Sequence, residues 1–450
     1  MSQSNDTTLP ALQALFQRAI NIRQGEGPAV FWSFVYFFSL LSSYYILRPI
    51  RDEMGITAGI ENMQWLFTGT FIAMLALVPL FGFITSRFQR KRFLPYVYYF
   101  FIINILLFHL LFESEFSLTY TARAFFIWLS VFNLFVVSVF WSFMTDLYQN
   151  EQAKRLFGLI AAGGTIGAIF GPLLTATLVQ RFGASQMLLI SAGLLGVSLI
   201  CIRQLIGWQK TQLDKSTDHQ AMDKLFEKPL GGGILNGIRL VARSPYLLGI
   251  CLLMLLFTLL STFLYFQQAQ IVKEAFSDSE ARTALFAAID LAVNALTLLI
   301  QTLLTARLVK RAGLGVTLAL IPLLLSLGFL VLGLFPILPV IIAVQVMRRA
   351  GNYAIMRPAR EMLYVVVSRE EKYKAKNLID TLVYRGGDAL SSWVYTGFRS
   401  IGFSLSAIAW MAVPISLAWA WVAFTLGKKQ GVIGNRSTVQ SGGEQYEQRQ

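Results

Sequence analysis

Charged residues are scarce in this chain. Only 14% of its 450 residues are Asp, Glu, Lys or Arg, whereas 55% are hydrophobic. A soluble domain of this length carries more charge, so the composition excludes an ordinary soluble protein. Apolar runs of about 20 residues recur instead, which is the length that crosses roughly 30 Å of hydrocarbon. Because the runs are continuous and backbone groups find no water in lipid, we predict an all-α polytopic membrane protein.

Cysteine and histidine are nearly absent, which removes two kinds of site. Cys201 and Cys251 both fall in apolar runs, so we expect buried thiols and no disulfide framework. His109 and His219 have no neighbours at the spacing of metal ligands, so no metal site is predicted.

The chain also lacks the motifs of common enzymes. It contains no GxxxxGK[ST] phosphate loop, no HExxH helix and no GxSxG nucleophile elbow. The stretch AAGGTIGAIFGP follows no strand, so we interpret it as a place where another helix approaches closely or where the helix bends. We therefore predict that the protein is not an enzyme and uses no cofactor.

The apolar runs predict twelve transmembrane helices in two halves of six. The halves cover residues 28–208 and 244–426, and a polar linker, 209–243, joins them. Residues 1–27 and 427–450 form polar tails, the second of which is predicted to be disordered. TSRFQRKR after the second run and TARLVKR after the eighth align at an offset of 220 residues. This short repeat favours two parallel halves related by an axis normal to the membrane.

The distribution of Lys and Arg predicts the topology. The tails and the loops after even-numbered runs hold about 30 of the 38 basic residues, and basic loops remain in the cytoplasm. We expect both termini to be cytoplasmic and the chain to be a monomer in a bacterial inner membrane. The net charge of +14 is explained by these loops, so no nucleic-acid partner is predicted.

Several charged residues lie inside or beside apolar runs. Each costs about 2.5–3.5 kcal/mol at the bilayer centre on insertion scales, so such residues usually line a polar path. Arginine dominates the set, and its planar fork binds phosphate or carboxylate in pairs of hydrogen bonds. The set comprises Arg48, Arg51, Asp52, Arg348, Arg349, Arg357, Arg360, Glu361, Asp380, Arg385 and Asp388.

Alternatives remain open for parts of this set. Arg348, Arg349, Arg357 and Arg360 are placed at or near one membrane face, where simple inside-positive anchoring is an equal explanation. Arg385 is predicted inside a buried helix, where Asp388 or Asp380 would instead neutralise it in a structural pair.

A carboxylate in the eighth run is a candidate for coupling. Asp290 and Asn294 lie one helical turn apart. An isolated carboxylate there would bind a proton and couple transport to it, whereas a hydrogen bond to another helix is an equally good explanation. Asp388 is the second coupling candidate. The seventh run has a polar face that includes Ser261, Tyr265 and Gln268.

Three stretches carry a family resemblance. They are YYILRPIRDEMG (44–55), FWSFMTDLYQNEQAKRLFG (140–158) and RPAREMLYVVVSREEKYKAKNLIDT (357–381). They resemble the ATP/ADP translocase, or NTP/NDP exchange, family of intracellular bacteria and plastids, which is related to the major facilitator superfamily. The third stretch is the most specific, because it matches the family pattern of Pro-x-basic-Glu-Met-x-Tyr followed by lysines and Ile-Asp. The matching positions are Pro358, Arg360, Glu361, Tyr364, Lys372, Lys374, Lys376, Ile379 and Asp380.

The resemblance implies a major-facilitator-like fold and an anionic, nucleotide-type substrate. Two family lysines correspond here to Arg51 and Arg360, which keep the charge. The family's glutamates in the fourth and seventh runs are absent, and Asn133 and Tyr265 stand in those runs. The chain therefore resembles a divergent member of the ATP/ADP translocase family. The implied substrate-binding residues are Arg48, Arg51, Asp52, Tyr265, Arg357, Arg360, Glu361, Lys374, Asp380 and Arg385.

These observations predict a secondary transporter that moves or exchanges a nucleotide-like anion by alternating access. Its partners would be that small anion and membrane lipid. One alternative is a proton-coupled transporter of another small solute. A second alternative is a membrane scaffold or lipid-handling protein that does not transport, in which the linker and basic loops bind a partner or anionic lipid.

Overall fold

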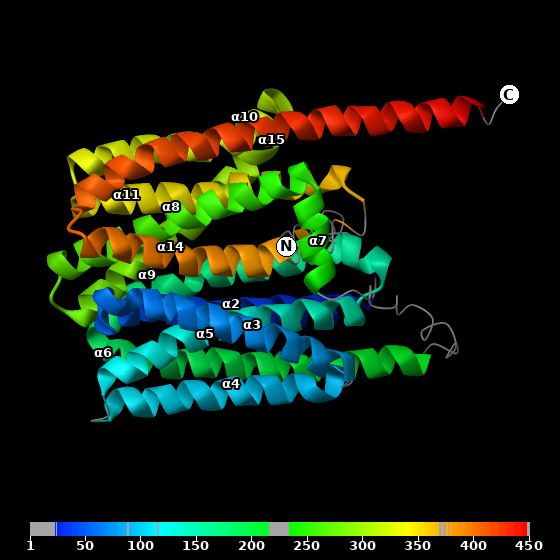
Figure 1. Ribbon diagram of the computed structural model, residues 1–450. Coiled ribbons are helices and arrows are strands. Elements are labelled where there is room, and N and C mark those ends of the chain that lie inside the picture. Colours follow the sequence, from blue (N-terminus) through cyan, green and yellow to red (C-terminus); the bar gives the residue numbers. More distant parts are fainter. Residues whose placement is uncertain are drawn as a thin grey trace, which may run out of the picture.

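The computed structural model describes residues 23, 25–87, 90–114, 117–215, 234–368, 371, 375–376 and 378–447, and all regular structure in these ranges is helical (Figure 1). The all-α prediction is therefore confirmed. The helices of the first half are α2 (Gly27–Thr57), α3 (Met63–Arg87), α4 (Arg90–Glu113), α5 (Leu118–Leu147) and α6 (Asn150–Lys215). Those of the second half are α7 (Ile234–Arg243), α8 (Pro245–Ala275), α9 (Ser279–Ile300), α10 (Ala306–Leu334), α11 (Leu338–Gly351), α12 (Arg357–Leu363), α14 (Tyr384–Ser400) and α15 (Leu405–Glu447).

Short helical segments of other types connect some of these elements. The 3₁₀ segments are η1 (Ile60–Asn62) and η4 (Tyr364–Val366). The π-helical segments are η2 (Gln301–Thr305), η3 (Asn352–Met356) and η5 (Ile379–Val383). Because η3 joins α11 directly to α12, residues 338–363 form one continuous rod, and η5 lengthens α14 in the same way.

Membrane crossings account for most of the helices. In the described residues, eight helical stretches are long and apolar enough to span a bilayer, and two of them contain 61 and 56 residues. Each of these two bends at a glycine with positive φ, Gly183 (81°) and Gly313 (76°), and so supplies two crossings. The rods 338–363 and 379–400 are too charged to be recognised by hydropathy. Counting them as spans gives twelve, the number that we predict from the sequence.

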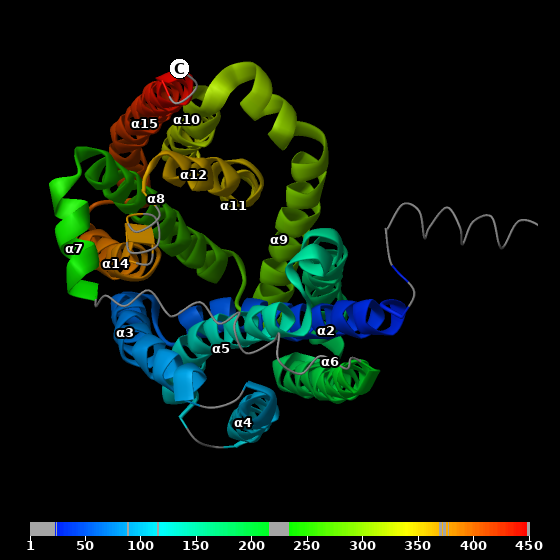
Figure 2. The ribbon, with the colours of Figure 1, turned by 90° about the vertical axis from the view of Figure 1, so that its right-hand side faces the viewer.

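The two halves form separate bundles. Viewed along the helices, α2 to α6 lie on one side and α8, α10, α11, α14 and α15 on the other, with α9 between them (Figure 2). Two hydrophobic cores follow this division: one is built mainly from residues 29–205, and the other contains only residues 241–426. The helix α9 belongs to the second half by sequence but packs against α2 and α6.

A structural repeat accompanies the sequence repeat. Gly183 joins the two crossings of α6, and Gly402 joins α14 to α15; both have positive φ, 81° and 91°. They are 219 residues apart, nearly the offset at which the two basic loops align. The chain therefore changes direction at the last connection of each half through a glycine in a conformation that other residues rarely adopt.

The glycine-rich stretch packs α6 against α2. A Cβ atom added to Gly167 would lie 2.4 Å from the backbone oxygen of Phe38, and one added to Gly171 would lie 2.6 Å from that of Ser42. Real Cβ atoms do not approach so closely, so only glycine permits this contact. The predicted close approach of another helix is confirmed.

We expect Gly167→Leu to lower the free energy of unfolding by at least about 1–3 kcal/mol, because the new side chain must push α2 away from α6. The measurement is the thermal unfolding midpoint of the purified protein in detergent. Gly193→Leu is the matched control, since nothing lies within 4 Å of a Cβ at that position on the same helix. Equal midpoints for the two variants would contradict this interpretation.

Polar contacts hold the start of α2 against α6. Glu26 accepts hydrogen bonds from Arg155 Nη2 (2.9 Å), Gln152 Nε2 (3.0 Å) and the backbone N–H of Arg23 (2.9 Å). Burial by itself raises the pKa of Glu26, but the Arg155 guanidinium and the other donors together lower it below the usual glutamate value. The ionised carboxylate is thus the stable form at neutral pH.

The predicted linker and tails differ from the structure or lie outside it. The first tail is described only from residue 23, and the linker is described only at its ends, which are helical through Lys215 and from Ile234. The prediction of a disordered tail from residue 427 is wrong for residues 427–447, because α15 continues to Glu447. No proline follows Pro414, and nothing in the polar composition stops the helix.

Candidate functional site

One buried carboxylate joins the two halves near their middle. Asp290 on α9 is 1% exposed. Its Oδ2 lies 3.6 Å from Arg48 Nε on α2, and its Oδ1 accepts a hydrogen bond from Arg349 Nη2 on α11. Asp290 therefore balances one arginine from the first half and one from the second.

A second buried arginine on α11 has only neutral partners. Arg348 is 9% exposed and donates hydrogen bonds to Ser261 Oγ on α8 (2.8 Å) and to Gln345 Oε1 (2.9 Å). Gln345 in turn donates to Gln268 on α8. No carboxylate in the described part of the chain forms an ion pair with Arg348. We call Arg48, Asp290, Arg348 and Arg349 the central cluster.

The structure corrects the predicted depth of Arg348 and Arg349. We expected them at or near a membrane face, but both are buried among helices, as the contacts above show. The apolar run ends before them in the sequence, whereas the rod that contains them continues to residue 363. At about 1.5 Å per residue, they lie roughly 15 Å from its first residue, well inside the bilayer.

Other predicted residues lie around the central cluster. Arg51 Nη1 lies 3.6 Å from Asp52 Oδ1, and the Tyr265 hydroxyl donates to the same oxygen at 3.0 Å. The Arg51 guanidinium also stacks 4.1 Å from the centre of the Phe126 ring. Since Tyr265 is on α8, its hydrogen bond to Asp52 of α2 also crosses between the halves.

Asp388 connects these residues to the second half. Arg385 Nη1 lies 3.8 Å from Asp388 Oδ2, one turn away on α14. Arg51 and Arg348 are also close enough to act on the Asp388 carboxylate electrostatically. The predicted structural pair of Arg385 therefore forms with Asp388, not with Asp380. Together, five arginines (48, 51, 348, 349, 385) face three aspartates (52, 290, 388), an excess of two positive charges.

The most specific sequence motif forms a separate group. Arg360 Nη2 lies 3.4 Å from Asp380 Oδ1, and Lys376 Nζ donates to Glu361 Oε2 at 2.5 Å. All four residues belong to the second half, and we call them the α12–η5 cluster. Arg357 is exposed. Lys374, also predicted, lies outside the described residues.

The coupling prediction changes for Asp290. It is not an isolated carboxylate, because two arginines contact it. Its neighbour Asn294 donates a hydrogen bond of 2.6 Å to the backbone oxygen of Ala168 on α6. The alternative of a bond to another helix is therefore confirmed for Asn294.

Contacts at one end of the bundle close it. Glu53 at the end of α2 is fully buried and accepts hydrogen bonds from Arg282 Nε and Nη2 on α9, both at 2.7 Å. Nearby, Trp393 on α14 donates to Thr68 on α3 at 3.0 Å. We call this the closed end, which is the left-hand end in Figure 1. Arg282 was missed from the sequence; its only signal was a basic residue within an acidic connection.

The proteins to which this chain is similar are described as carriers or transporters. A family model described as Major Facilitator Superfamily matches residues 29–371. The chain belongs to this superfamily. ADP,ATP carrier protein 1 of Chlamydia muridarum is 21% identical over 476 aligned positions, which cover 90% of this chain and 89% of that protein. Among solved structures, the nucleoside transporter NupG has a TM-score of 0.61 at 13% identity, covering 90% of this chain and 99% of NupG. The POT family transporter PepTSo has a TM-score of 0.59 at 14% identity, covering 92% and 98%.

Membership of the Major Facilitator Superfamily confirms several predictions. The protein is a multi-pass membrane transporter, not an enzyme, and it is a divergent member that is similar to ADP,ATP carriers. One residue that departs from the carrier pattern forms a contact between the two halves. Tyr265 lies in the run where the resemblance implies a family glutamate, and its hydroxyl donates a hydrogen bond to Asp52 of α2 across the two halves.

Proposed function

We propose that this protein carries a nucleotide-type anion across the bacterial inner membrane by alternating access, in exchange for a related anion. The observation that carries this proposal is Arg348, a buried guanidinium that donates hydrogen bonds but forms no ion pair in the described part of the chain. A buried charge is costly unless it is paired. A phosphate group bound beside Ser261 and Arg348 would supply the missing negative charge.

Unused donors nearby support the same ligand chemistry. In the part of the chain that the structure describes, the Nε atoms of Arg51 and Arg349 are buried and make no hydrogen bond, and Arg48 Nε has only its 3.6 Å ion-pair contact with Asp290. Together with the excess of two positive charges, these donors favour a ligand with more than one negative charge. Similarity to ADP,ATP carriers points to a nucleotide as that ligand.

The central cluster also supplies a mechanism for exchange. Arg48 and Arg349 come from different halves and share Asp290. A phosphate that binds these arginines would replace part of the interaction with Asp290 and would change how strongly the halves are held together. Only a ligand that binds the two cavity orientations differently moves the equilibrium between them. The closed end would face outward, and both termini would be cytoplasmic, as the basic loops predict.

Thermal stabilisation of the purified protein tests this proposal. ATP, ADP, sugar phosphates and organic anions are compared at high concentration; a ligand at 100 times its Kd stabilises the folded state by about 2.7 kcal/mol. We expect a nucleotide to raise the unfolding midpoint in the wild type but not in Arg348→Gln. Arg181→Gln, an exposed site on α6, is the matched control and should behave as the wild type.

Other outcomes would overturn the proposal or its substrate. If another anion raises the unfolding midpoint and no nucleotide does, the proposed site stands but its substrate is that other anion. Transport of an uncharged solute driven by a pH gradient in liposomes would favour the proton-coupled alternative. Nucleotide shifts that persist in Arg348→Gln would show that this arginine does not bind the anion.

A further inference from the structure

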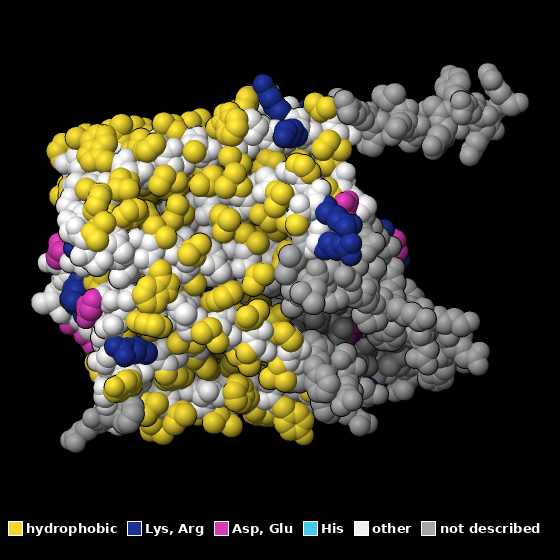
Figure 3. Space-filling view, viewed as in Figure 1, with side chains coloured by type: hydrophobic (Ala, Val, Ile, Leu, Met, Phe, Trp, Pro, Cys, Tyr) yellow, Lys and Arg dark blue, Asp and Glu magenta, His cyan; other side chains and the backbone are white. Residues whose placement is uncertain are grey.

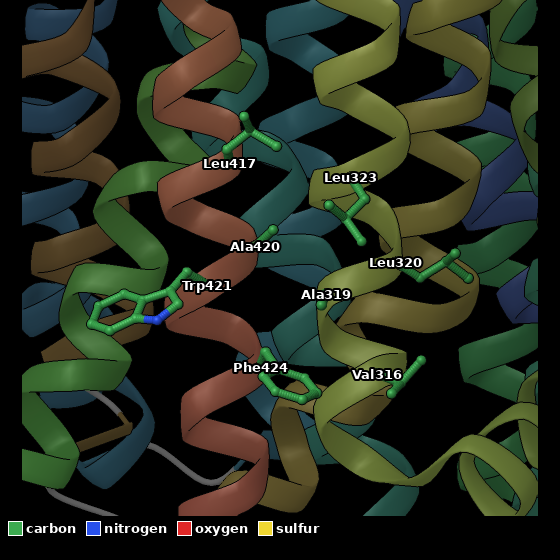
Figure 4. Close-up of a pocket in the computed structure, with 8 residues that line it drawn as sticks. All are labelled: Val316, Ala319, Leu320, Leu323, Leu417, Ala420, Trp421 and Phe424. Carbon is green, nitrogen blue, oxygen red and sulfur yellow. The ribbon is translucent and has the colours of Figure 1, made fainter.

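A groove lies on the outer surface of the second half, between α10 and α15. Its volume is about 340 Å³, within the range of roughly 300–1,000 Å³ for ligand pockets. Leu320 and Leu323 form one wall and Leu417 and Trp421 the other, and the small side chains of Ala319 and Ala420 lie between them (Figure 4). It is far from the central cluster, since α10 and α15 lie at the edge of the bundle (Figure 2).

The groove accepts hydrocarbon and little else. Its accessible lining is entirely apolar, and several of its side chains are exposed, Trp421 to 69% and Leu323 to 49%. At membrane depth such side chains face lipid tails, because water is absent. The groove ends at a tight crossing of the two helices, where a Cβ on Gly427 would lie 2.3 Å from Gly315 Cα. The groove is therefore closed at this end.

Basic side chains gather at the same end of the groove. Lys428 and Lys429 are exposed one turn beyond Phe424, a lining residue, and Lys428 Nζ lies 4.5 Å from the centre of the Phe424 ring. Arg307, Lys310 and Arg311 are exposed on α10 just before its bend at Gly313.

These basic residues have no acidic neighbours along their own helices. No Asp or Glu occurs in 301–333 or 405–433, and none of the five forms an ion pair within the ranges that the structure describes. In the space-filling view, the face over α10 and α15 is largely apolar, with Lys and Arg side chains where α15 leaves the bundle (Figure 3).

We propose that this groove binds an anionic phospholipid. One acyl chain would lie between Leu320 and Trp421, and the phosphate would contact Lys428 and Lys429. Basic loops alone are explained by topology. Here they adjoin the closed end of an apolar groove, and Lys428 covers the Phe424 ring in its wall, so the acyl chain and the headgroup can be held together. Basic pockets between transmembrane helices bind anionic headgroups in this way.

Native mass spectrometry of the full-length protein tests the proposal, with dioleoyl-phosphatidylglycerol and dioleoyl-phosphatidylcholine as probes. We expect the anionic lipid to bind preferentially. Each lysine contributes about fivefold to the affinity for an anionic lipid. Lys428→Ala combined with Lys429→Ala should therefore weaken the binding of phosphatidylglycerol about 25-fold and leave the binding of phosphatidylcholine unchanged. The matched control removes two exposed basic residues elsewhere, Lys210→Ala with Arg243→Ala, and should change the affinity for neither lipid.

A second variant separates the groove from the charge. Ala420→Phe fills the slot and should reduce the binding of both lipids, while the unfolding midpoint in lipid-free detergent confirms that the variant folds. Equal affinity for the two lipids in the wild type would overturn the proposal. Glycerol phosphate that competes with phosphatidylglycerol at equal concentration would also overturn it, because the site would then be a simple anion site.

Discussion

Replacing Asp290 with asparagine is expected to lower the free energy of unfolding by about 3–5 kcal/mol. The reason is that Arg48 and Arg349 would lose the carboxylate between them while both stay buried, and a buried charge without its partner is strongly destabilising. Thermal or denaturant unfolding of the purified protein in detergent measures the effect. The surface carboxylate Glu151, whose partner Lys154 is 76% exposed, provides the control, since Glu151→Gln should cost no more than about 1 kcal/mol.

A double-mutant cycle distinguishes a pair from two independent effects. Arg349→Gln should also destabilise the protein, because Asp290 then keeps only Arg48, at 3.6 Å. If the two residues act as a pair, Asp290→Asn combined with Arg349→Gln costs less than the sum of the single variants. Additive costs would contradict the pairing. An unchanged unfolding midpoint for Asp290→Asn, together with loss of pH-driven uptake, would instead identify Asp290 as a proton carrier.

Replacing Glu53 with glutamine is expected to open the closed end. Glu53 is fully buried and also accepts hydrogen bonds from Ser279 Oγ (3.2 Å) and Thr57 Oγ1 (2.9 Å). Glutamine cannot satisfy the two nitrogens of Arg282 as a carboxylate does, so the closed state loses about 3 kcal/mol. This converts to a population shift of roughly 100-fold toward the state that is open at this end.

Spin labels can follow this opening directly. Cysteines placed at Glu61 and Ser277, exposed positions in different halves near Arg282, report the separation of the halves at the closed end, and we expect longer distances in Glu53→Gln. The native cysteines are replaced by alanine in all samples. Glu113→Gln, which changes an exposed carboxylate at the last residue of α4, serves as the control. A distance distribution identical to the wild type would show that Glu53 does not hold this end closed.

The sequence indicated more about the architecture than about the site. Hydropathy predicted helical spans in the correct places because a bilayer demands long apolar helices whatever their neighbours are. The two rods 338–363 and 379–400 are less apolar than the other spans, since their charges lower hydropathy although other helices surround them. The twelve runs predicted from the sequence nevertheless include both. The resemblance carried by residues 44–55 and 357–381 pointed to the right family of transporters.

The residues by themselves determined the fold class. They also predicted the division near residue 209–243 and an anionic ligand, because arginines at membrane depth are too costly to be incidental. Only the tertiary structure decided that Asp290 pairs with Arg48 and Arg349, that Arg348 forms no ion pair among the described residues, and that Arg282 binds Glu53 at one end of the bundle. The reason is physical. Lipid is as apolar as a helix interface, so hydropathy does not show which face of a span turns inward, and partners from different helices are chosen only when the helices pack.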